Sequence, residues 1–248
     1  MKPTLLIDSS YFIFYRIHAL LTWWKLAHPE STQENILDTS EFQEKFKLSF
    51  SKKIKEMIKR LQLEEYEIIV AKDCPRKMIW RNDYFKLLNH IDTIPPEELL
   101  DFPNNKDILL QKYSVETNKD YKGGRNNTLN VKPIFNLVWQ EKLFELAGAN
   151  LIIQHKYLEA DDCIALLVKK YSPERLIAII TSDHDYLQLM NENINIYTLK
   201  YKPLICDDPK KSLFIKCICG DKSDNIKGIF KRCGKKTAEL YYKNPELF

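Results

Sequence analysis

The stretch LIAIITSD at residues 176–183 decides the fold class, because a continuous apolar run ends abruptly on a polar turn that closes with Asp183. A run of this length and character is typical of a strand buried on both faces of a sheet. Similar apolar runs stand at 4–7, 68–71 and 151–153, separated by segments with helical spacing. This alternation predicts an α/β fold with a parallel central sheet and helices on both faces.

Helices are expected wherever apolar residues recur at helical spacing behind a polar cap. Such segments cover 11–26, 41–61, 133–147 and 159–171, and one more is expected after Asp183. Two regions break the rhythm: 91–120 is polar and interrupted by prolines, which is typical of a functional or mobile loop, and 206–248 lacks a strong strand. We therefore expect an α/β domain over 1–205, with an insertion at about 84–132, and a small helical module over 206–248.

Composition excludes several classes of protein. The 248 residues are 44% hydrophobic and 29% charged, as in an ordinary globular protein rather than a disordered one. No apolar run approaches the roughly 18 residues of a membrane span, and the chain leads directly into its first strand, which argues against a signal peptide. The six cysteines are expected to be reduced thiols in an intracellular, reducing compartment.

Positive charge is concentrated near the C-terminus. The net charge of the chain is only +4, but residues 200–236 hold eleven basic and four acidic residues. A basic region on a nearly neutral body favours a polyanionic partner. On charge alone, a lysine-rich solvated surface is an equal alternative.

Acidic residues follow the predicted strands at the edge where ligands bind in parallel sheets. Asp8, Asp73 and Asp183 each follow an apolar run, and six more acids stand nearby in short motifs: Asp185, Glu159, Asp161, Asp162, Asp221 and Asp224. Any one cluster is also explained by helix capping and the helix dipole. Nine carboxylates on one edge would repel each other, and hard divalent cations such as Mg²⁺ or Mn²⁺ would neutralise them.

Paired divalent ions held by carboxylates suit in-line displacement at phosphorus. Such chemistry requires no serine or cysteine nucleophile. The histidines show no ligand spacing, the pair Cys217 and Cys219 is weak as a zinc motif, and no glycine-rich phosphate loop is present. The residues therefore predict hydrolysis of phosphodiesters with two metal ions.

Six motifs, taken in order, resemble the 5′-nuclease family of flap endonucleases, phage 5′-exonucleases and the 5′-nuclease domain of bacterial DNA polymerases. They are LIDSSY at 6–11 with Tyr15-Arg16, Asp73 with Trp80-Arg81, YKGGR at 121–125, EADD at 159–162, TSDHD at 181–185, and GDKSDNIKGI at 220–229 with GKKTA at 234–238. The resemblance implies a PIN-like nuclease domain with a C-terminal helix-three-turn-helix module, also described as a helix-hairpin-helix.

The resemblance implies roles for individual residues. One metal group would comprise Asp8, Asp73, Glu159 and Asp161. The acids around the second ion would be Asp162, Asp183, Asp185, Asp221 and Asp224. The cations that reach the scissile phosphate would be Lys122, Arg81 and Arg125, which would stabilise charge in the transition state. The DNA-binding residues would be Arg16, Lys227, Gly228, Gly234, Lys235, Lys236 and Thr237, with a K⁺ ion in the module.

The implied function is that of a structure-specific 5′ nuclease in DNA replication or repair. It would act on DNA with 5′ flaps, nicks or ends, as a 5′-3′ exonuclease and flap endonuclease, and on RNA–DNA hybrids. We expect a monomeric protein that does not interact with a membrane. Between Arg81 and Tyr121 lie 39 residues where family members have fewer than ten, which predicts an enlarged or rebuilt arch.

Three alternatives remain open at the level of sequence. A PIN-type endoribonuclease shares the strand-end carboxylates, but typically lacks the GDKSDN motif at 220–225. A non-catalytic nucleic-acid-binding protein would be expected to lose metal ligands, and none is missing. A phosphatase of another α/β family would carry an Asp-x-Asp motif after the first strand, where this chain has Asp8-Ser9-Ser10.

Overall fold

The computed structural model describes residues 2–29, 35–87, 93–113, 121–122, 129–224, 226–230 and 232–247. The chain divides into two compact units, each built from two segments. The first, which we call the sheet unit, comprises Met1–Cys74 and Asn127–Pro209. The second, the helical unit, comprises Pro75–Asn126 and Lys210–Phe248. The sheet unit ends at Pro209, and Pro75–Asn126, which contains most of the expected insertion, belongs to the helical unit. The domain boundary expected at residue 205 stays a prediction.

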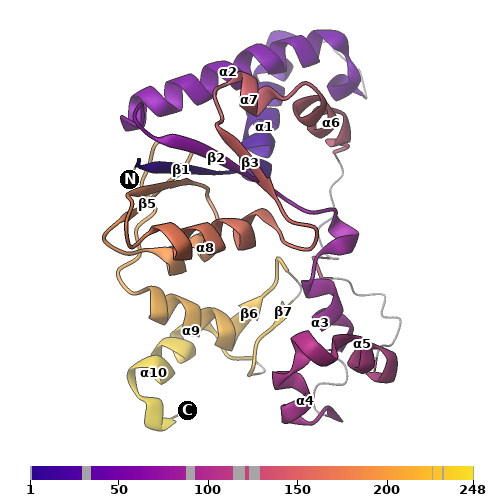
Figure 1. Ribbon diagram of the computed structural model, residues 1–248, viewed down its shortest axis with the longest axis vertical. Coiled ribbons are helices and arrows are strands. Elements are labelled where there is room, and N and C mark those ends of the chain that lie inside the picture. Colours follow the sequence, from indigo (N-terminus) through magenta and orange to yellow (C-terminus); the bar gives the residue numbers. More distant parts are fainter. Residues whose placement is uncertain are drawn as a thin grey trace. The chain divides into compact units, whose positions relative to one another are not determined.

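The sheet unit is built on a five-stranded sheet with the order β3-β2-β1-β4-β5, in which every neighbouring pair is parallel (Figure 1). The strands are β1 (Thr4–Asp8), β2 (Glu67–Lys72), β3 (Leu151–Gln154), β4 (Ile177–Ile180) and β5 (Ile194–Tyr197). In the central strand, Ile7 lies level with Val70 of β2 and Ile180 of β4. The predicted parallel sheet is thereby confirmed, while β5 was not expected from the sequence.

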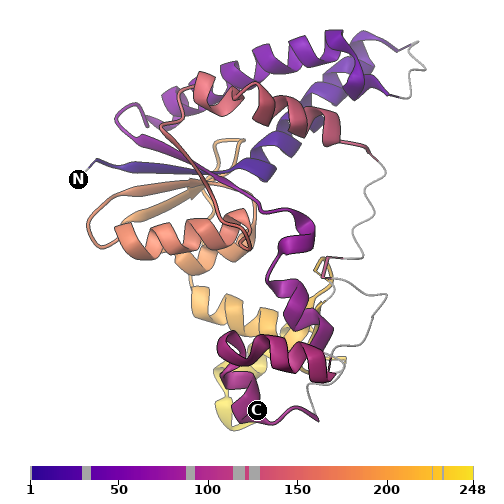
Figure 2. The same ribbon diagram turned by 45° about the vertical axis from the view of Figure 1, so that its right-hand side comes forward.

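Helices cover both faces of the sheet, as the sequence predicted (Figure 2). One face, which includes Leu5 and Ile7, packs on α1 (Ser9–Ala27), α2 (Ser40–Leu61), α6 (Lys132–Gln140) and α7 (Leu143–Leu146), with the 3₁₀ turn η1 (Ile36–Asp38) at their edge. The other face, which includes Leu6, packs on α8 (Ala160–Tyr171) and the 3₁₀ helix η4 (His184–Leu189). Because successive strand residues point to opposite faces, both layers bury apolar side chains and β1 is fully enclosed.

Two helices differ from the expectation. The helix expected over 133–147 is divided into α6 and α7, because Lys142 adopts a left-handed backbone conformation with a φ of 53° and interrupts the α-helical path. The helix expected after Asp183 is the short 3₁₀ helix η4. Both differences arise from local backbone geometry that apolar spacing does not encode.

The helical unit contains two groups of helices. The segment after Cys74 forms η2 (Arg76–Met78), α3 (Arg81–Leu87), α4 (Pro96–Leu100) and α5 (Phe102–Tyr113). Leu87, Ile94 and Leu109 form a small core there, so the described part of the expected excursion is helical rather than an irregular loop. Residues 114–120 lie outside the described ranges.

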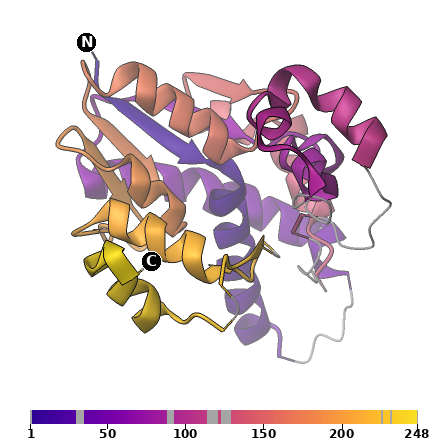
Figure 3. The same ribbon diagram turned by 90° about the horizontal axis from the view of Figure 1, so that it is seen from below.

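The second group holds α9 (Pro209–Cys219), the short strands β6 (Gly220–Asp221) and β7 (Ile226–Lys227), α10 (Lys235–Lys243) and the turn η5 (Pro245–Leu247) (Figure 3). An ion pair between Lys211 and Glu239 joins α9 to α10. The β6–β7 hairpin requires glycine: a Cβ added to Gly220 would lie 2.3 Å from the backbone nitrogen of Gly228, and the φ of Gly220 is 77°.

All six cysteines are free thiols: Cys74, Cys163, Cys206, Cys217, Cys219 and Cys233. Among the described helices, none is both long enough and apolar enough to cross a membrane.

Candidate active site

Asp8 lies at the carboxyl end of the central strand and starts helix α1. Its Oδ1 accepts a hydrogen bond from the backbone N–H of Tyr11 at 3.1 Å, which caps the helix. Its Oδ2 accepts a hydrogen bond from the Tyr186 hydroxyl at 3.1 Å. Tyr186 is buried on η4, and sequence reasoning missed it because nothing in its neighbourhood marks a contact with a strand 178 positions away.

Asp73 follows the neighbouring strand β2 and joins three elements of the sheet unit. Its Oδ2 accepts a hydrogen bond from the Ser10 hydroxyl on α1. Its Oδ1 accepts one from the backbone N–H of Ala160 at 2.7 Å, at the start of α8. Asp73 therefore fixes the N-terminus of α8 beside the end of β2, and Ser10 is a second site residue that the sequence did not single out.

The EADD motif forms the N-terminus of α8, and its side chains accept hydrogen bonds from its own backbone N–H groups. Glu159 and Asp162 form a reciprocal capping box, in which the Glu159 N–H donates to Asp162 Oδ2 at 3.1 Å. Asp161 Oδ1 accepts from the Asp162 N–H at 2.7 Å. The capping role that the sequence left open is thus present for Glu159 and Asp162, alongside any role in binding an ion.

Three of these carboxylates share one electrostatic environment. The pKa of Asp8 is raised to about 7, chiefly by burial, then by the charge of Asp73 and, to a smaller extent, by that of Asp161. The hydrogen bonds from Tyr11 and Tyr186 lower the pKa of Asp8 but do not offset the rise. Burial and the charges of Asp8 and Asp161 also raise the pKa of the Tyr186 hydroxyl well above its usual value. Burial, reinforced by repulsion between the acids, therefore disfavours the ionised form of Asp8 at this end of the sheet.

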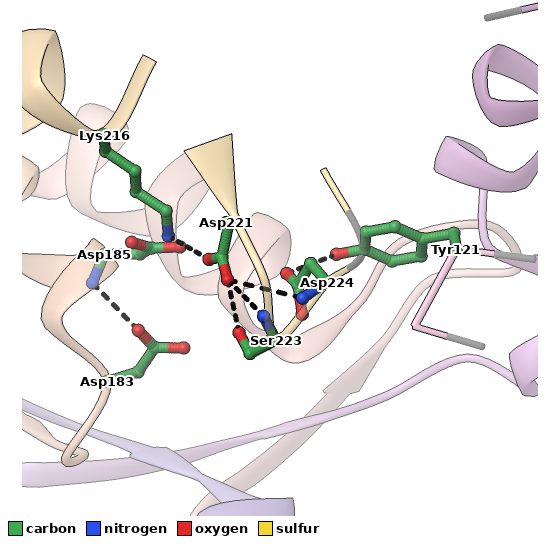
Figure 4. Close-up of polar contacts among 7 residues, drawn as sticks. All are labelled: Tyr121, Asp183, Asp185, Lys216, Asp221, Ser223 and Asp224. Carbon is green, nitrogen blue, oxygen red and sulfur yellow. Dashed lines mark hydrogen bonds and ion pairs between the residues drawn. The ribbon is translucent and has the colours of Figure 1, made fainter. Parts of the chain in front are cut away.

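Asp183 and Asp185 lie after β4, the other neighbour of the central strand. Asp183 caps η4 by accepting a hydrogen bond from the Asp185 N–H at 2.9 Å (Figure 4). The Asp183 N–H in turn donates to the Thr181 hydroxyl at 3.1 Å. Seven of the nine predicted acidic ligands thus belong to the sheet unit, at or just after the carboxyl ends of its strands.

The donor chemistry of this set fits a hard divalent cation, because all its donors are carboxylate oxygens under mutual repulsion. Across the described residues, however, no three His, Cys, Asp or Glu side chains are arranged to hold a metal ion. The hydrogen bonds from Ser10, Tyr186 and the α8 backbone account for the present orientation of the carboxylates.

The other two predicted acids lie in the helical unit: Asp221 ends β6, and Asp224 is on the turn that follows it (Figure 4). Asp221 Oδ1 accepts hydrogen bonds from the Ser223 N–H at 2.8 Å and the Ser223 hydroxyl at 2.6 Å, and its Oδ2 lies 2.9 Å from Lys216 Nζ. Burial raises the pKa of Asp221, but the hydrogen bonds from Ser223 and Lys216 outweigh it and hold that pKa well below its usual range. Asp224 Oδ2 accepts from the Tyr121 hydroxyl at 3.2 Å.

Two of the three predicted catalytic cations are described, both in the helical unit. The Lys122 N–H donates to the carbonyl of Asp224 at 3.3 Å, and Arg76 Nη2 donates to the Lys122 carbonyl at 2.7 Å. These bonds hold Lys122 at a left-handed φ of 59°. Arg81 begins α3, with its guanidinium 4.9 Å from the centre of the Trp80 ring. Arg125 lies outside the described residues.

The predicted DNA-binding residues fall into two environments. Arg16 is half-buried on α1; burial lowers its pKa, and its Nε is buried without a hydrogen-bond partner among the described residues. The others belong to the helical unit: Lys227 and Gly228 on and after β7, Gly234 as the N-cap of α10, and Lys235, Lys236 and Thr237 in its exposed first turn. No acidic residue occupies that turn.

Comparison with known proteins confirms the resemblance predicted from the motifs. Residues 107–213 match the family model of the N-terminal resolvase-like domain of 5′-3′ exonucleases. A 5′-3′ exonuclease of Bacillus subtilis (strain 168) is 31% identical over 148 residues, which cover 53% of this chain and 48% of the relative. The matched stretch thus spans about half the length of that relative.

Solved structures confirm the fold. A T5 protein co-crystallised with metal ions has a TM-score of 0.55 and 16% identity, covering 98% of this chain and 75% of that one. A variant of the bacteriophage T5 flap endonuclease, in a pseudo-enzyme-product complex with DNA and metal ions, has a TM-score of 0.54, 17% identity and the same coverage. At such identities the likeness shows the α/β fold alone.

Proposed function

We propose that this chain is a metal-dependent 5′ nuclease that hydrolyses phosphodiesters of DNA, as a 5′-3′ exonuclease and flap endonuclease. The observation that carries the proposal is the grouping of Asp8 with Asp73 and Asp161 at one end of the sheet, where burial first, and then repulsion by Asp73 and Asp161, raise the pKa of Asp8 to about 7. Carboxylates under such repulsion at the ligand-binding edge of a parallel sheet suit a divalent cation. The matched family model and the matched relatives, which are 5′-3′ exonucleases, support the same activity.

Asp8, Asp73, Glu159 and Asp161 would hold one ion, and Asp162, Asp183, Asp185, Asp221 and Asp224 would surround a second. Bound Mg²⁺ or Mn²⁺ would supply positive charge to the phosphodiester and activate the attacking water. Ser10 and the Ala160 N–H hold Asp73, and Tyr186 and the Tyr11 N–H hold Asp8, so these donors keep both acids at the carboxyl edge of the sheet.

The cations of the helical unit would stabilise the charge that develops on the phosphate. Lys122 is suited to this role because its backbone is hydrogen-bonded on both sides, to Asp224 and Arg76, which fixes the root of the side chain. Arg81 and Arg125 are assigned the same role from the family resemblance. Arg16 is proposed as a further contact to the DNA backbone.

The C-terminal part of the helical unit would bind the phosphate backbone of duplex DNA as a helix-three-turn-helix module. The first turn of α10 presents its free N–H groups with Lys235, Lys236 and Thr237 exposed, a combination that favours phosphate. Such contacts carry no base information, so recognition would depend on DNA structure. A K⁺ ion in the hairpin, a monomeric state and activity on hybrids belong to the same proposal.

The test is a cleavage assay with labelled flap, nicked, blunt-ended, RNA–DNA hybrid and single-stranded RNA substrates in Mg²⁺, with cleavage positions mapped. We expect cutting near 5′ ends and flap junctions in DNA, and none after chelation with EDTA. Asp8→Asn should be inactive, whereas Asp38→Asn, which changes an exposed acid in the same unit, should cleave normally. Cleavage restricted to single-stranded RNA would favour the alternative, a PIN-type endoribonuclease, and undiminished turnover in EDTA would exclude a metal-dependent mechanism.

A further inference from the structure

A groove unrelated to the carboxylates runs between α2 and α7 on the outer layer of the sheet unit. It encloses about 480 Å³, and residues from α2, from α7 and from Glu141 just before α7 line it. The α2 residues Leu48, Ser51, Lys52 and Lys55 are three or four positions apart, so they form a single stripe along the helix. The groove is therefore formed by the packing of α2 against α7.

The floor of this groove is apolar and open to solvent. Leu48 on α2 is 72% exposed and Leu146 on α7 is 73% exposed, although both line the same hollow. Leu143 lies buried beneath them and connects the groove to the main core. Single exposed leucines are common, but leucines that converge on a groove from two helices mark a binding surface.

The rim of the groove is basic. Helix α2 carries seven basic and three acidic residues. Lys47 is already ion-paired with Glu44 and Glu141, at 2.7 and 2.8 Å. Lys52 and Lys55 are exposed beside the leucines, and neither forms an ion pair with another residue in the described ranges. Two cations beside an apolar floor complement an acidic ligand that carries apolar side chains.

We propose that this groove binds an acidic segment of a partner protein, with one or two large apolar side chains between Leu48 and Leu146 and carboxylates against Lys52 and Lys55. The volume lies within the range of ligand pockets, and an amphipathic helix laid in a groove is a recurrent mode of peptide recognition. A nucleic-acid backbone would use the lysines but would leave the leucine floor without a partner. None of these residues belongs to the candidate active site.

A selection experiment tests the occupant directly. The full chain is panned against a phage library of random peptides, with parallel panning on the double variant Leu48→Ser and Leu146→Ser. We expect peptides enriched only on the unaltered chain to carry Asp or Glu beside Leu, Ile, Phe or Met. Enrichment of the same peptides on both proteins, or of peptides without acidic residues, would overturn the proposal.

The enriched peptide, made with a fluorescent label, then gives affinities by anisotropy. Because one leucine contact is worth about 1.4 kcal/mol or more, we expect the leucine variant to bind at least about tenfold more weakly. The pair Lys52→Glu and Lys55→Glu should weaken binding similarly and remove its dependence on salt. The matched control, Leu166→Ser with Lys169→Glu on α8, changes an exposed leucine and lysine elsewhere and should bind as the unaltered chain does.

Two other results would assign the groove differently and overturn the proposal. If the Lys52 and Lys55 variant lost affinity for duplex DNA but kept its affinity for the peptide, the face would be a nucleic-acid surface. If the unaltered chain sedimented as a dimer and the leucine variant sedimented as a monomer, the occupant would be a second copy of the chain. Circular dichroism of every variant shows whether the helices are retained.

Discussion

Asp8 in the sheet unit and Asp221 in the helical unit are both partly buried carboxylates at the end of a strand, yet their pKa values move in opposite directions. Burial and the charge of Asp73 raise the pKa of Asp8 to about 7. Asp221 is also disfavoured by burial, but Ser223 and Lys216 donate to it and its pKa is lowered. At Asp8 burial is the largest effect and the neighbouring carboxylates add to it, whereas at Asp221 the hydrogen-bond donors and Lys216 outweigh burial. The difference separates an acid without a cationic partner from one that is already paired with a lysine.

The contrast between Asp8 and Asp221 loses its functional meaning if Asp8 is not needed for the reaction. Asp8→Asn keeps the size of the side chain and removes its charge, so we expect DNA cleavage in Mg²⁺ to fall by at least about 10²-fold while DNA binding is kept. Single-turnover cleavage and a separate binding titration in Ca²⁺ measure the two effects. Equal rates for Asp8→Asn and the unaltered chain would remove Asp8 from the site.

A second test uses the pH dependence of stability in protein prepared without divalent ions. The folded-state pKa of Asp8 lies above the unfolded value of about 3.9, so its contribution to stability is fully present below about pH 4 and is lost as pH rises to about 7. A shift of about three pKa units corresponds to about 4 kcal/mol; because Asp8 is partly exposed, we expect on the order of 2 kcal/mol.

Urea unfolding at pH 5 and pH 8 measures this loss, with Asp8→Asn as the reference that lacks it. Mg²⁺ should restore stability at pH 8 more than at pH 5, because only the ionised carboxylate attracts the ion. The same pH slope in Asp8→Asn as in the unaltered chain would show that another group titrates.

The contribution of Asp221 to stability is expected to change with pH in the opposite direction. Its lowered pKa means that its contribution to stability is present above about pH 4 and is lost as pH falls below that value. Lys216→Met removes the ion pair but keeps the length of the side chain, and we expect it to cost about 1 kcal/mol at both pH 7 and pH 3, because the lowered pKa keeps Asp221 ionised in the folded protein at both values. Thermal unfolding at the two pH values measures the cost, with Lys210→Met on the same helix as the control.

The smallest expected effect concerns the cations of α10. Replacement of Lys235 and Lys236 by Ala should lower the slope of log affinity for duplex DNA against log salt by about 0.9 for each phosphate that the variant no longer neutralises. The decrease in affinity should be the same for any base sequence. Lys169→Ala with Lys170→Ala is the matched control, and an unchanged slope in the α10 variant would make these lysines ordinary surface charges.

The sequence predicted the parts of the molecule that depend on local pattern. Continuous apolar runs identified β1, β2, β3 and β4, and the position of Asp8 and Asp73 after two of them placed both acids at one edge of the sheet. The capping box of Glu159 and Asp162 was visible as an alternative role, and the structure contains it.

What the sequence missed depends on contacts between distant segments or on single backbone angles. Tyr186 and Ser10 become site residues only because folding brings them to Asp8 and Asp73. The break between α6 and α7 follows from the left-handed Lys142, for which apolar periodicity gives no signal. The helices α4 and α5 were hidden by prolines, although Pro96 stands at the first turn of α4, where proline is compatible with a helix.

The central position of β1 has a consequence for how the chain folds during synthesis. This strand is synthesised before the other strands of the sheet, yet one of its two neighbours, β4, ends at Ile180. At roughly 5–20 residues per second, about 170 further residues need on the order of ten to thirty seconds. Throughout that time one edge of β1 lacks its native hydrogen-bonding partner, so the nascent chain depends on α1, α2 and β2 to shield the strand from aggregation.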